Sequence, residues 1–398
     1  MKKIKKIDYL IGENKINKVS TIPFDIEVCS FLNTLSNELN LINDVNGYPD
    51  LKTLAFWLRK KNLENLKNKF SNSNRRLGVG LVFHITPSNI PINFAYSLVF
   101  GLLSGNTNVV KVPSQRFNQV KILCKIIKKI LKNRKFSKIK KMITIVRYTD
   151  QDQFTEYVSS QCDARVIWGG DKTINNIRKF QIPTRSIDVS FADRYSVSLI
   201  NSIEIIKIDK KKLIQLVEKF YNDTFIVDQN GCSSPQLILW YGSKKDKVKA
   251  KDIFWNALLN YTKIKYDMPD IASIDKLNLL FESIISEKNI ISEKRYGNII
   301  YTLLLNKIDK KIDRLRGKWG FFFQYDLENF DEIKKIISKK IQTVTYFGFK
   351  KEKFVEFINN NNIDGVDRIV PIGQALDLGL VWDGYDVINS LSRIIEVK

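Results

Sequence analysis

Cys232 is the strongest candidate for a nucleophile in this chain. It lies in the segment Asn230-Gly-Cys-Ser-Ser-Pro235, a turn expected between a helix and a strand. Gly231 is expected to allow a backbone conformation that other residues resist, and a close approach of substrate. A thiol exposed at such a turn can be held as thiolate by nearby donors. The alternative is a small buried hydrophobe, which is what most free cysteines are, and the local sequence alone favours that alternative.

A second group that could do chemistry is the carboxamide of Asn89. It lies in Ile85-Thr-Pro-Ser-Asn-Ile-Pro91, after an expected strand and before an apolar helix. Pro87 and Pro91 stiffen this loop, and a rigidly held carboxamide can donate a hydrogen bond to an oxyanion. An asparagine that merely caps the following helix explains the residue equally well.

Two further strand ends carry residues suited to a cofactor. Lys111 closes an expected strand, where its ammonium group could meet a ribose or a phosphate, although one lysine means little in a chain so rich in lysine. Gly169 and Gly170 follow another strand, and paired glycines expose backbone N–H groups that can bind phosphate. The segment is not a GxGxxG fingerprint, so an ordinary tight turn is the simpler interpretation.

The composition limits which chemistries are open to the chain. His84 is the single histidine, so no multi-histidine metal site can form, and its apolar surroundings favour a hydrogen-bonded core imidazole. The four cysteines lie too far apart for a CxxC site and are expected to be reduced thiols in a cytoplasmic protein. No apolar run approaches the ~18 residues needed to cross a bilayer. We therefore expect no bound metal and no membrane span.

The charge of the chain is strongly positive. The formal net charge is +23, from 65 basic and 42 acidic residues among 398. Such a charge could attract nucleic acid, anionic lipid or a phosphorylated cofactor. Lysine, isoleucine and asparagine are abundant from end to end, however, and no single segment holds the excess. A chain-wide compositional bias is the simpler explanation, and we expect no nucleic-acid partner.

Strand and helix patterns alternate through most of the chain. Apolar residues at helical spacing predict a mainly helical segment at the start, and short apolar runs alternating with amphipathic ones then predict parallel sheets with helices on both faces. In such folds ligands bind at the carboxyl ends of the strands. The expected strands are 79–85, 108–112, 142–146, 165–168, 196–200, 236–240 and 341–349, and the expected helices are 92–103, 120–131, 210–223 and lysine-rich stretches up to about residue 340.

These patterns suggest an organisation in four parts. We expect a helical N-terminal segment at 1–75, a cofactor-binding α/β domain at 76–203 and a catalytic α/β domain with the nucleophilic cysteine at 204–365. The remaining segment, 366–398, is expected to pack back on the core or to form a subunit contact.

An ordered set of motifs resembles one known family. Pro87 to Pro91, Gly105-Asn106 with Lys111, Gly169-Gly170 and a later Gly-Cys turn resemble the aldehyde dehydrogenase superfamily. The whole set is similar to the LuxC-type acyl-CoA reductases, and the segments that carry this closer resemblance are Trp168-Gly-Gly170, Asp188 to Ser196, Gly231 to Pro235, Gln342-Thr343, Asp367 to Gly373 and Trp382-Asp-Gly384. The resemblance covers roughly residues 77 to 393, and an ordered set is far more specific than one motif. It implies an aldehyde-dehydrogenase-like α/β fold with two lobes, each built on a mostly parallel sheet flanked by helices.

The resemblance also implies a reaction. Cys232 would attack an acyl-CoA or acyl-protein thioester, and hydride from a nicotinamide cofactor would then release a fatty aldehyde. Asn89 and the Cys232 backbone N–H would stabilise the oxyanion. Hydrolytic relatives use a glutamate base in the segment matching residues 188–195, where this chain has none, which agrees with reduction and leaves a base role for Asp188 or Asp193 in doubt.

The cofactor and the partners follow from the same resemblance. Relatives that prefer NAD carry an acidic residue three positions after the lysine, whereas this chain has Ser114, followed two positions later by Arg116. The missing carboxylate and the added cation predict NADPH. An acyl-transferring partner enzyme and a homo-oligomer are also expected, whereas the tail residues Arg368, Trp382, Asp383 and Arg393 have no role derivable from sequence.

Two other functions stay open at this point. One is a CoA-acylating aldehyde dehydrogenase working in the oxidative direction, which would use the same residues. The other is a catalytically inactive basic binding protein, against which the presence of both Cys232 and Asn89 argues.

Overall fold

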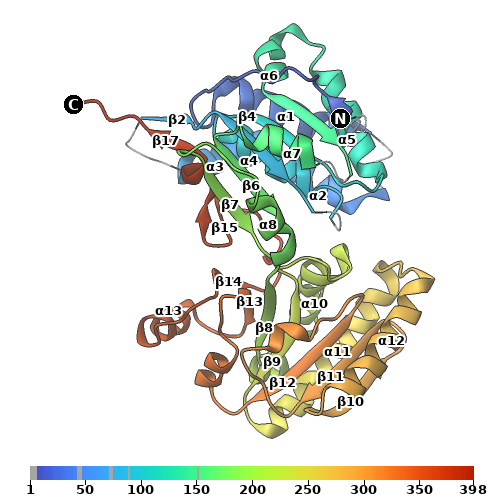
Figure 1. Ribbon diagram of the computed structural model, residues 1–398. Coiled ribbons are helices and arrows are strands. Elements are labelled where there is room, and N and C mark those ends of the chain that lie inside the picture. The colour runs from blue at the N-terminus through green and yellow to red at the C-terminus, as the bar shows by residue number, and fades with distance from the viewer. Residues whose placement is uncertain (1–6, 43–46, 71–74, 88–89, 150–151) are drawn as a thin grey trace. The chain divides into compact units, whose positions relative to one another are not determined.

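The chain forms two compact units in a computed structural model that describes residues 7–42, 47–70, 75–87, 90–149 and 152–398. The first unit comprises residues 1–193 and 378–398, and the second comprises residues 194–377 (Figure 1). Each unit is built on its own sheet. Asn89 lies outside the described residues.

The first unit has a six-stranded sheet in the order β1-β5-β4-β3-β6-β7. Only the β1–β5 pair among these neighbours is antiparallel. Every residue of β3 and β6 is buried, as expected for central parallel strands covered on both faces. The strands are β1 (Asp8–Ile11), β3 (Leu81–Ile85), β4 (Thr107–Lys111), β5 (Ile143–Arg147), β6 (Ala164–Trp168) and β7 (Ile187–Phe191).

The direction in which the chain winds reverses between β3 and β6. Strands β4 and β5 follow β3 on one side, whereas β6 and β7 lie on its other side. In doubly wound sheets this switch point opens a crevice at the carboxyl ends of the two strands. Ile85 and Trp168, the last residues of β3 and β6, therefore flank the expected ligand position of this unit.

Helices of the first unit bury the apolar stripes that the sequence predicts. In α5 (Asn118–Ile130), Val120, Leu123, Ile126 and Ile127 are buried while the lysines between them face outward. α4 (Asn93–Leu103) is apolar nearly all round and is buried along most of its length. The other helices are α1 (Ile26–Leu41), α2 (Pro49–Trp57), α3 (Lys60–Lys69), α6 (Ser137–Lys141), α7 (Asp152–Ser159), α8 (Asp171–Arg178) and α14 (Val387–Ser390).

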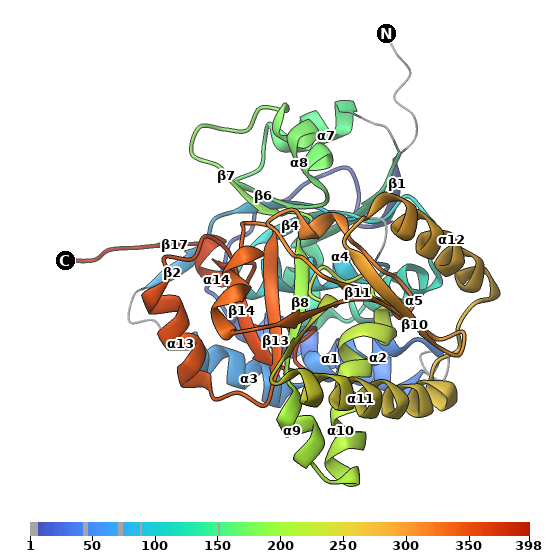
Figure 2. The same ribbon diagram turned by 90° about the horizontal axis from the view of Figure 1, so that it is seen from below.

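The second unit has a seven-stranded sheet in the order β10-β11-β12-β9-β8-β13-β14. Only the β10–β11 pair among these neighbours is antiparallel. Both views show α13 beside β14 at one edge of this sheet (Figures 1 and 2). The elements are β8 (Tyr195–Asn201), α9 (Ser202–Lys207), α10 (Lys210–Thr224), β9 (Pro235–Tyr241), α11 (Lys244–Lys265), α12 (Asp270–Ser286), β10 (Ile290–Tyr296), β11 (Ile300–Leu305), β12 (Phe321–Leu327), β13 (Ile341–Phe347), α13 (Lys351–Asn360) and β14 (Arg368–Pro371).

The structure corrects two expectations about secondary structure. The lysine-rich helices end at Ser286, and the strands β10, β11 and β12 follow where helix was expected up to about residue 340. β10 is an edge strand whose middle, Ser292 to Arg295, is polar and exposed, so its sequence lacks the apolar run that marks a buried strand. The N-terminal segment contains the strand β1 as well as helices, because β1 adds to the edge of the first sheet.

The boundaries of the two units differ from the boundaries expected for the four parts. β8 pairs with β9 and β13, so the chain enters the second unit after Asp193 rather than at residue 203. α1 to α3 share one core with α4 and α5, so residues 1–75 form part of the first unit. The C-terminal segment is shared: β14 joins the second sheet, whereas β15 (Val381–Trp382), β16 (Tyr385–Asp386) and β17 (Ser392–Ile394) belong to the first unit, where β17 pairs with β2 (Arg76–Gly78).

Across the described residues, no helix combines the length and the apolar character that a membrane crossing requires.

Candidate active site

Cys232 lies in a turn at the amino end of β9. Its side chain is half-buried, and its carbonyl oxygen accepts a hydrogen bond of 2.7 Å from the Ser196 hydroxyl. The same hydroxyl accepts one of 3.2 Å from the Thr343 backbone N–H. Ser196 on β8 therefore ties the cysteine turn to β8 and β13 at once.

Gln342 is a partner of Cys232 that reasoning from the local sequence did not identify. Its Nε2 donates to the Cys232 Sγ at 3.2 Å, and its Oε1 accepts from the Thr343 hydroxyl, also at 3.2 Å. Gln342 and Thr343 are fully buried at the start of β13. The adjacent polar residues Gln342 and Thr343 near the start of the strand were the available signal, but the Cys232 partner of Gln342 lies 110 positions away in the chain.

This cluster is found at the amino ends of β8, β9 and β13. Ligands are expected at the carboxyl ends of the strands in such folds, whereas Cys232 and its partners lie at the opposite ends in the second unit. The reason is local: the thiol comes from the loop that precedes β9, so its neighbours are the first residues of the parallel strands on that side.

The loop before Cys232 has unusual backbone geometry. Asp228 and Gln229 both have positive φ, 50° and 60°, whereas Gly231 does not. Space at Gly231 is tight instead, since a Cβ there would meet the Ser234 Oγ at 3.0 Å. The expectation that Gly231 supplies a special backbone conformation is therefore wrong. The left-handed conformations in this loop belong to Asp228 and Gln229.

Buried side chains hold this loop in place. The Gln229 carboxamide donates to the carbonyls of Pro235 and Phe321 and accepts from the Gly320 N–H. Asp228 accepts a 2.7 Å hydrogen bond from the Tyr266 hydroxyl. Burial raises the pKa of Asp228, and the bond from Tyr266 opposes that change. Strained backbone conformations persist where their surroundings over-determine them, and these contacts do so here.

Charged residues fix the strand starts beside Cys232. Arg194 forms a 2.7 Å ion pair with Asp367 and donates to the Ile341 carbonyl. The Asp367 backbone N–H donates to the Gln342 carbonyl at 2.9 Å. These bonds hold the segment that positions the Gln342 side chain.

Arg368, a residue of the tail motif, has a structural role. Its guanidinium donates to the carbonyls of Gln374, Ala375 and Asp377, so it organises the loop after β14. The Asp223 carboxylate holds the same loop by accepting hydrogen bonds from the backbone N–H groups of Gly373 and Ala375. Burial raises the pKa of Asp223 to about 7, against these two hydrogen bonds, which lower it.

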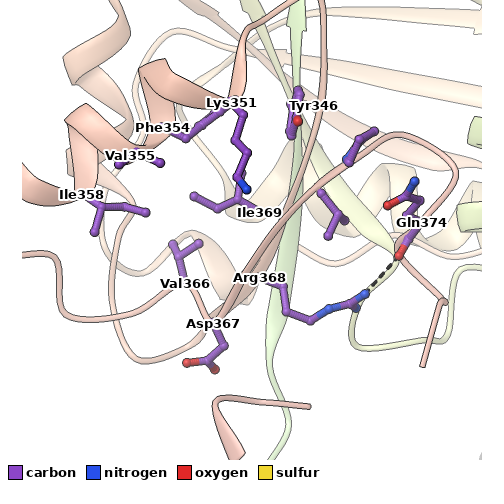
Figure 3. A pocket seen from close by; sticks show the side chains of 12 residues that line it. Tyr346, Lys351, Phe354, Val355, Ile358, Val366, Asp367, Arg368, Ile369 and Gln374 are labelled. Atoms are coloured by element: carbon purple, nitrogen blue, oxygen red, sulfur yellow. Dashed lines mark hydrogen bonds between the residues drawn. The ribbon is translucent and has the colours of Figure 1, made fainter. Parts of the chain in front are cut away.

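An apolar cavity of about 420 Å³ lies between α13 and β14 (Figure 3). Arg368 points away from α13 toward the Gln374 carbonyl, while Lys351 stands over the apolar lining. That lining includes Phe354, Val355, Ile358, Val366, Ile369 and Val370. Because β14 pairs with β13, the cavity occupies the edge of the sheet that carries Gln342.

The other three cysteines are poor nucleophiles. Cys124 and Cys162 are buried, and burial raises the pKa of each thiol to about 12. Cys29 is half-buried, and burial raises its pKa to about 11. A thiolate is the reactive form of cysteine, so these three thiols are expected to be unreactive near neutral pH.

In the first unit, Trp168 fixes the paired glycines at the switch point. Its ring stacks on Phe191 with centroids 3.9 Å apart, and its indole N–H donates to Ser97. Gly170 is exposed and is the N-cap of α8, and a Cβ on Gly170 would meet nothing within 4 Å. The turn is thus open to a phosphate at a helix N-terminus, although Asp171 already places a carboxylate in the first turn.

The expected cofactor residues after β4 lie on an ordered, exposed loop. Lys111 stands at the carboxyl end of β4 with its Nζ 4.8 Å from the Tyr148 ring centroid. Arg147 donates to the Pro113 carbonyl and so fixes the start of the loop. Ser114 and Arg116 are exposed, so both side chains are open to a ligand. A basic, carboxylate-free strand end of this kind fits a phosphorylated dinucleotide.

His84 is confirmed as a core residue. Its Nε2 lies 2.9 Å from the Asn108 Oδ1, and its Nδ1 lies 2.7 Å from the Ser97 hydroxyl. The Ser97 hydroxyl accepts a hydrogen bond from the Trp168 indole N–H, so the Ser97 O–H donates to Nδ1 of His84. His84 is therefore a neutral imidazole whose proton is on Nε2 and points to Asn108. Burial lowers the pKa of His84 to about 4.

Asp188 is bound in an ion pair and is no free base. Its two oxygens accept from Arg165 at 2.7 and 2.8 Å, and Arg165 is almost fully buried. Arg178 approaches the same carboxylate at 3.7 Å. Asp193 is exposed at the last position of this part of the first unit.

Solved structures with the same fold are aldehyde dehydrogenases. Glyceraldehyde-3-phosphate dehydrogenase GapN from Methanocaldococcus jannaschii, solved with NADP, matches with a TM-score of 0.61 and 16% identity over 94% of this chain and 90% of that one. Aldehyde dehydrogenase 21 from Physcomitrella patens matches with a TM-score of 0.62 and 12% identity over 93% and 85% of the two chains. The chain therefore has the aldehyde dehydrogenase fold, as the sequence predicted.

The family is narrower than the fold. The model of the acyl-CoA reductase (LuxC) family matches residues 57–394, so the chain belongs to that family of oxidoreductases. A long-chain acyl-protein thioester reductase from Vibrio harveyi is 21% identical over 323 residues, which cover 79% of this chain. The chain spans 63% of the length of that relative.

Proposed function

We propose that this protein reduces a long-chain fatty acyl thioester, carried by CoA or by a protein, to the aldehyde through an acyl-Cys232 intermediate. The observation that carries the proposal is the half-buried Cys232 thiol, which receives a hydrogen bond from Gln342 in a turn tied to β8 and β13. Membership of the acyl-CoA reductase family and the activity for which the Vibrio harveyi relative is named support the same substrate class.

The first chemical step belongs to the thiolate. The Cys232 Sγ attacks the carbonyl carbon of the thioester and forms a new carbon–sulfur bond. The bond to the CoA or carrier sulfur then breaks, and that sulfur leaves as a thiolate that takes a proton from solvent. The Cys232 backbone N–H and Asn89 donate to the oxyanion of the tetrahedral species.

NADPH, held by Lys111, Ser114, Arg116 and the Gly169-Gly170 turn, supplies a hydride when bound. The exposed, carboxylate-free loop after β4 supports the phosphorylated cofactor, and one structural relative was solved with NADP. After reduction the oxyanion re-forms a carbonyl, the carbon–sulfur bond breaks, and Cys232 is released with the aldehyde. Acyl-CoA, NADPH and one proton are thus converted to aldehyde, CoA and NADP⁺.

A direct assay tests this proposal. Purified protein is mixed with a series of fatty acyl-CoAs and NADPH, and cofactor oxidation and aldehyde formation are followed. Without NADPH, mass spectrometry should find one acyl group on the peptide containing Cys232. Cys232→Ser should abolish both signals, whereas Cys29→Ser, which changes another half-buried thiol, should keep them. Full aldehyde output from Cys232→Ser would overturn the proposal.

A second variant tests the oxyanion donor. Losing one such donor typically costs about 2.7 to 4 kcal/mol in the barrier. Asn89→Ala should therefore slow turnover by roughly 100-fold or more while cofactor affinity, measured by fluorescence titration, stays nearly constant. An unchanged turnover rate would remove Asn89 from the mechanism.

A further inference from the structure

We propose that Gln342 is a catalytic residue: its carboxamide N–H holds Cys232 as a thiolate and stabilises the same sulfur when it leaves the reduced intermediate. Only the second half of this inference rests on the proposed function. The first half concerns the free protein and can be measured without any substrate.

The geometry places a donor on the nucleophile itself. Gln342 Nε2 lies 3.2 Å from the Cys232 Sγ, within the range for a hydrogen bond to sulfur. The donor is fully buried, so its amide dipole acts where solvent screening is weak. A sulfur that carries negative charge gains more from this N–H than a neutral thiol does.

Neighbouring bonds hold the Gln342 carboxamide and the Cys232 turn in place. The Thr343 hydroxyl bonds the Gln342 oxygen, while the Gln342 main-chain carbonyl accepts from the Asp367 N–H. Ser196 holds the other partner by its bond to the Cys232 carbonyl. Donor and sulfur are therefore each tied to the strands, and the thiolate needs little reorganisation to be solvated.

The opposite orientation of the carboxamide has the opposite consequence. With the oxygen toward the sulfur, Gln342 would accept a proton from the thiol and favour the neutral form. A hydroxyl can bond either end of the amide, so the Thr343 contact alone does not select the orientation. The sign of the change in thiol acidity on removing the carboxamide distinguishes the two arrangements.

The role in the reaction follows from the same contact. The N–H supports the thiolate that attacks the thioester carbonyl. When the tetrahedral intermediate collapses, the electron pair of the carbon–sulfur bond returns to the Cys232 sulfur. The N–H then stabilises the negative charge that develops on this sulfur. One donor therefore assists both the attack of the Cys232 sulfur and its departure.

The experiment measures the thiol directly. The wild-type chain and Gln342→Leu are alkylated with iodoacetamide between pH 5 and 10, and the rate at Cys232 is followed by peptide mass spectrometry. Gln342→Leu should shift the midpoint upward by about one pH unit, which makes alkylation near neutral pH about tenfold slower. Gln342→Glu, of the same size but anionic, should shift it further in the same direction.

Other charged groups near the strand starts have partners that none of these substitutions removes. Arg194 and Asp367 pair with each other, Asp228 bonds Tyr266, and Arg316 donates to main-chain carbonyls, including that of Arg194. Thr343→Val keeps the Gln342 carboxamide but removes the hydroxyl that bonds it. The alkylation midpoint of this variant should therefore shift less than that of Gln342→Leu. Gln181→Leu, at an exposed glutamine of the first unit, should leave the midpoint unchanged.

The outcomes separate this inference from the proposed function. An unchanged or lowered midpoint in Gln342→Leu, with thermal unfolding like that of the wild type, would overturn the role of Gln342. Gln342→Met repeats the measurement if the leucine variant does not fold. Failure of the wild type to take an acyl group would refute the proposed function and would leave the alkylation result valid.

Discussion

Both units bury a hydrogen-bonded network of side chains, and the two networks differ in one respect. In the first unit, Trp168, Ser97, His84 and Asn108 bond one another, and all four are buried. In the second unit, the chain of bonds through Thr343 and Gln342 ends on Cys232, which is half-buried. Under the proposed function, the first network is structural, whereas the second acts on the atom that meets the substrate.

The position in the sheet explains this difference. His84 and Asn108 lie within central strands covered by helices on both faces, so no ligand can reach them. Cys232 lies in the loop before β9 rather than within a strand, and it is only half-buried. Disturbing the first network should therefore change stability, and disturbing the second should change thiol chemistry.

The largest expected effect is in the buried ion pair of the first unit. Arg165→Met should lower the free energy of unfolding by about 3 to 5 kcal/mol, because it leaves the Asp188 carboxylate without its main partner. Urea unfolding measures this loss. Under conditions where the variant is folded, alkylation of Cys232 should be unchanged. Unaltered stability together with a lost acyl adduct would instead assign Asp188 a chemical role.

A smaller effect is the pH dependence that His84 gives to stability. Burial lowers its pKa from 6.5 to about 4, so the unfolded chain binds a proton that the folded chain excludes between these values. This contribution is complete above pH 6.5 and is lost as pH falls toward 4, and it amounts to about 3 kcal/mol. His84→Gln should unfold with a weaker pH dependence over that window. Equal slopes for variant and wild type would contradict a neutral buried imidazole.

In the second network, Ser196→Ala should act on the nucleophile. It removes the donor to the Cys232 carbonyl and the acceptor of the Thr343 N–H, which should slow acyl transfer by about tenfold. Ser198→Ala is the matched control on the same strand, since the Ser198 hydroxyl has no hydrogen-bond partner within the part of the chain that is described. Equal rates of acylation for the two variants would show that tethering the turn is unimportant.

How much the sequence predicts also differs between the two regions. Central strands such as β3 and β6 are recognisable because burial on both faces demands mostly apolar residues. β10 escapes prediction because one exposed edge strand needs no such run. Cys232 is identifiable from its Gly-Cys turn and from the order of motifs around it.

The partners of Cys232 are not predictable in the same way. Gln342 reaches the thiol only because β13 pairs with β8, and Ser196 reaches the turn from a third segment. Such contacts depend on strand order and register, which a local pattern of residue types does not contain. The residues that tune a nucleophile are therefore less visible in sequence than the nucleophile itself.

The smallest expected effect concerns the exposed loop after β4, which belongs to neither buried network. Arg116→Ala should lower the preference for NADPH over NADH, expressed as a ratio of kcat/KM values, by about fivefold, since an exposed ion pair contributes about 1 kcal/mol at most. Ser114→Glu should lower it as well, because a carboxylate repels the 2′-phosphate and can bond a free ribose hydroxyl. Both variants should keep the wild-type rate of Cys232 alkylation, since that measurement involves no cofactor. If the wild-type protein used NADPH and NADH equally well, this loop would not discriminate between the two cofactors, and the prediction would fail.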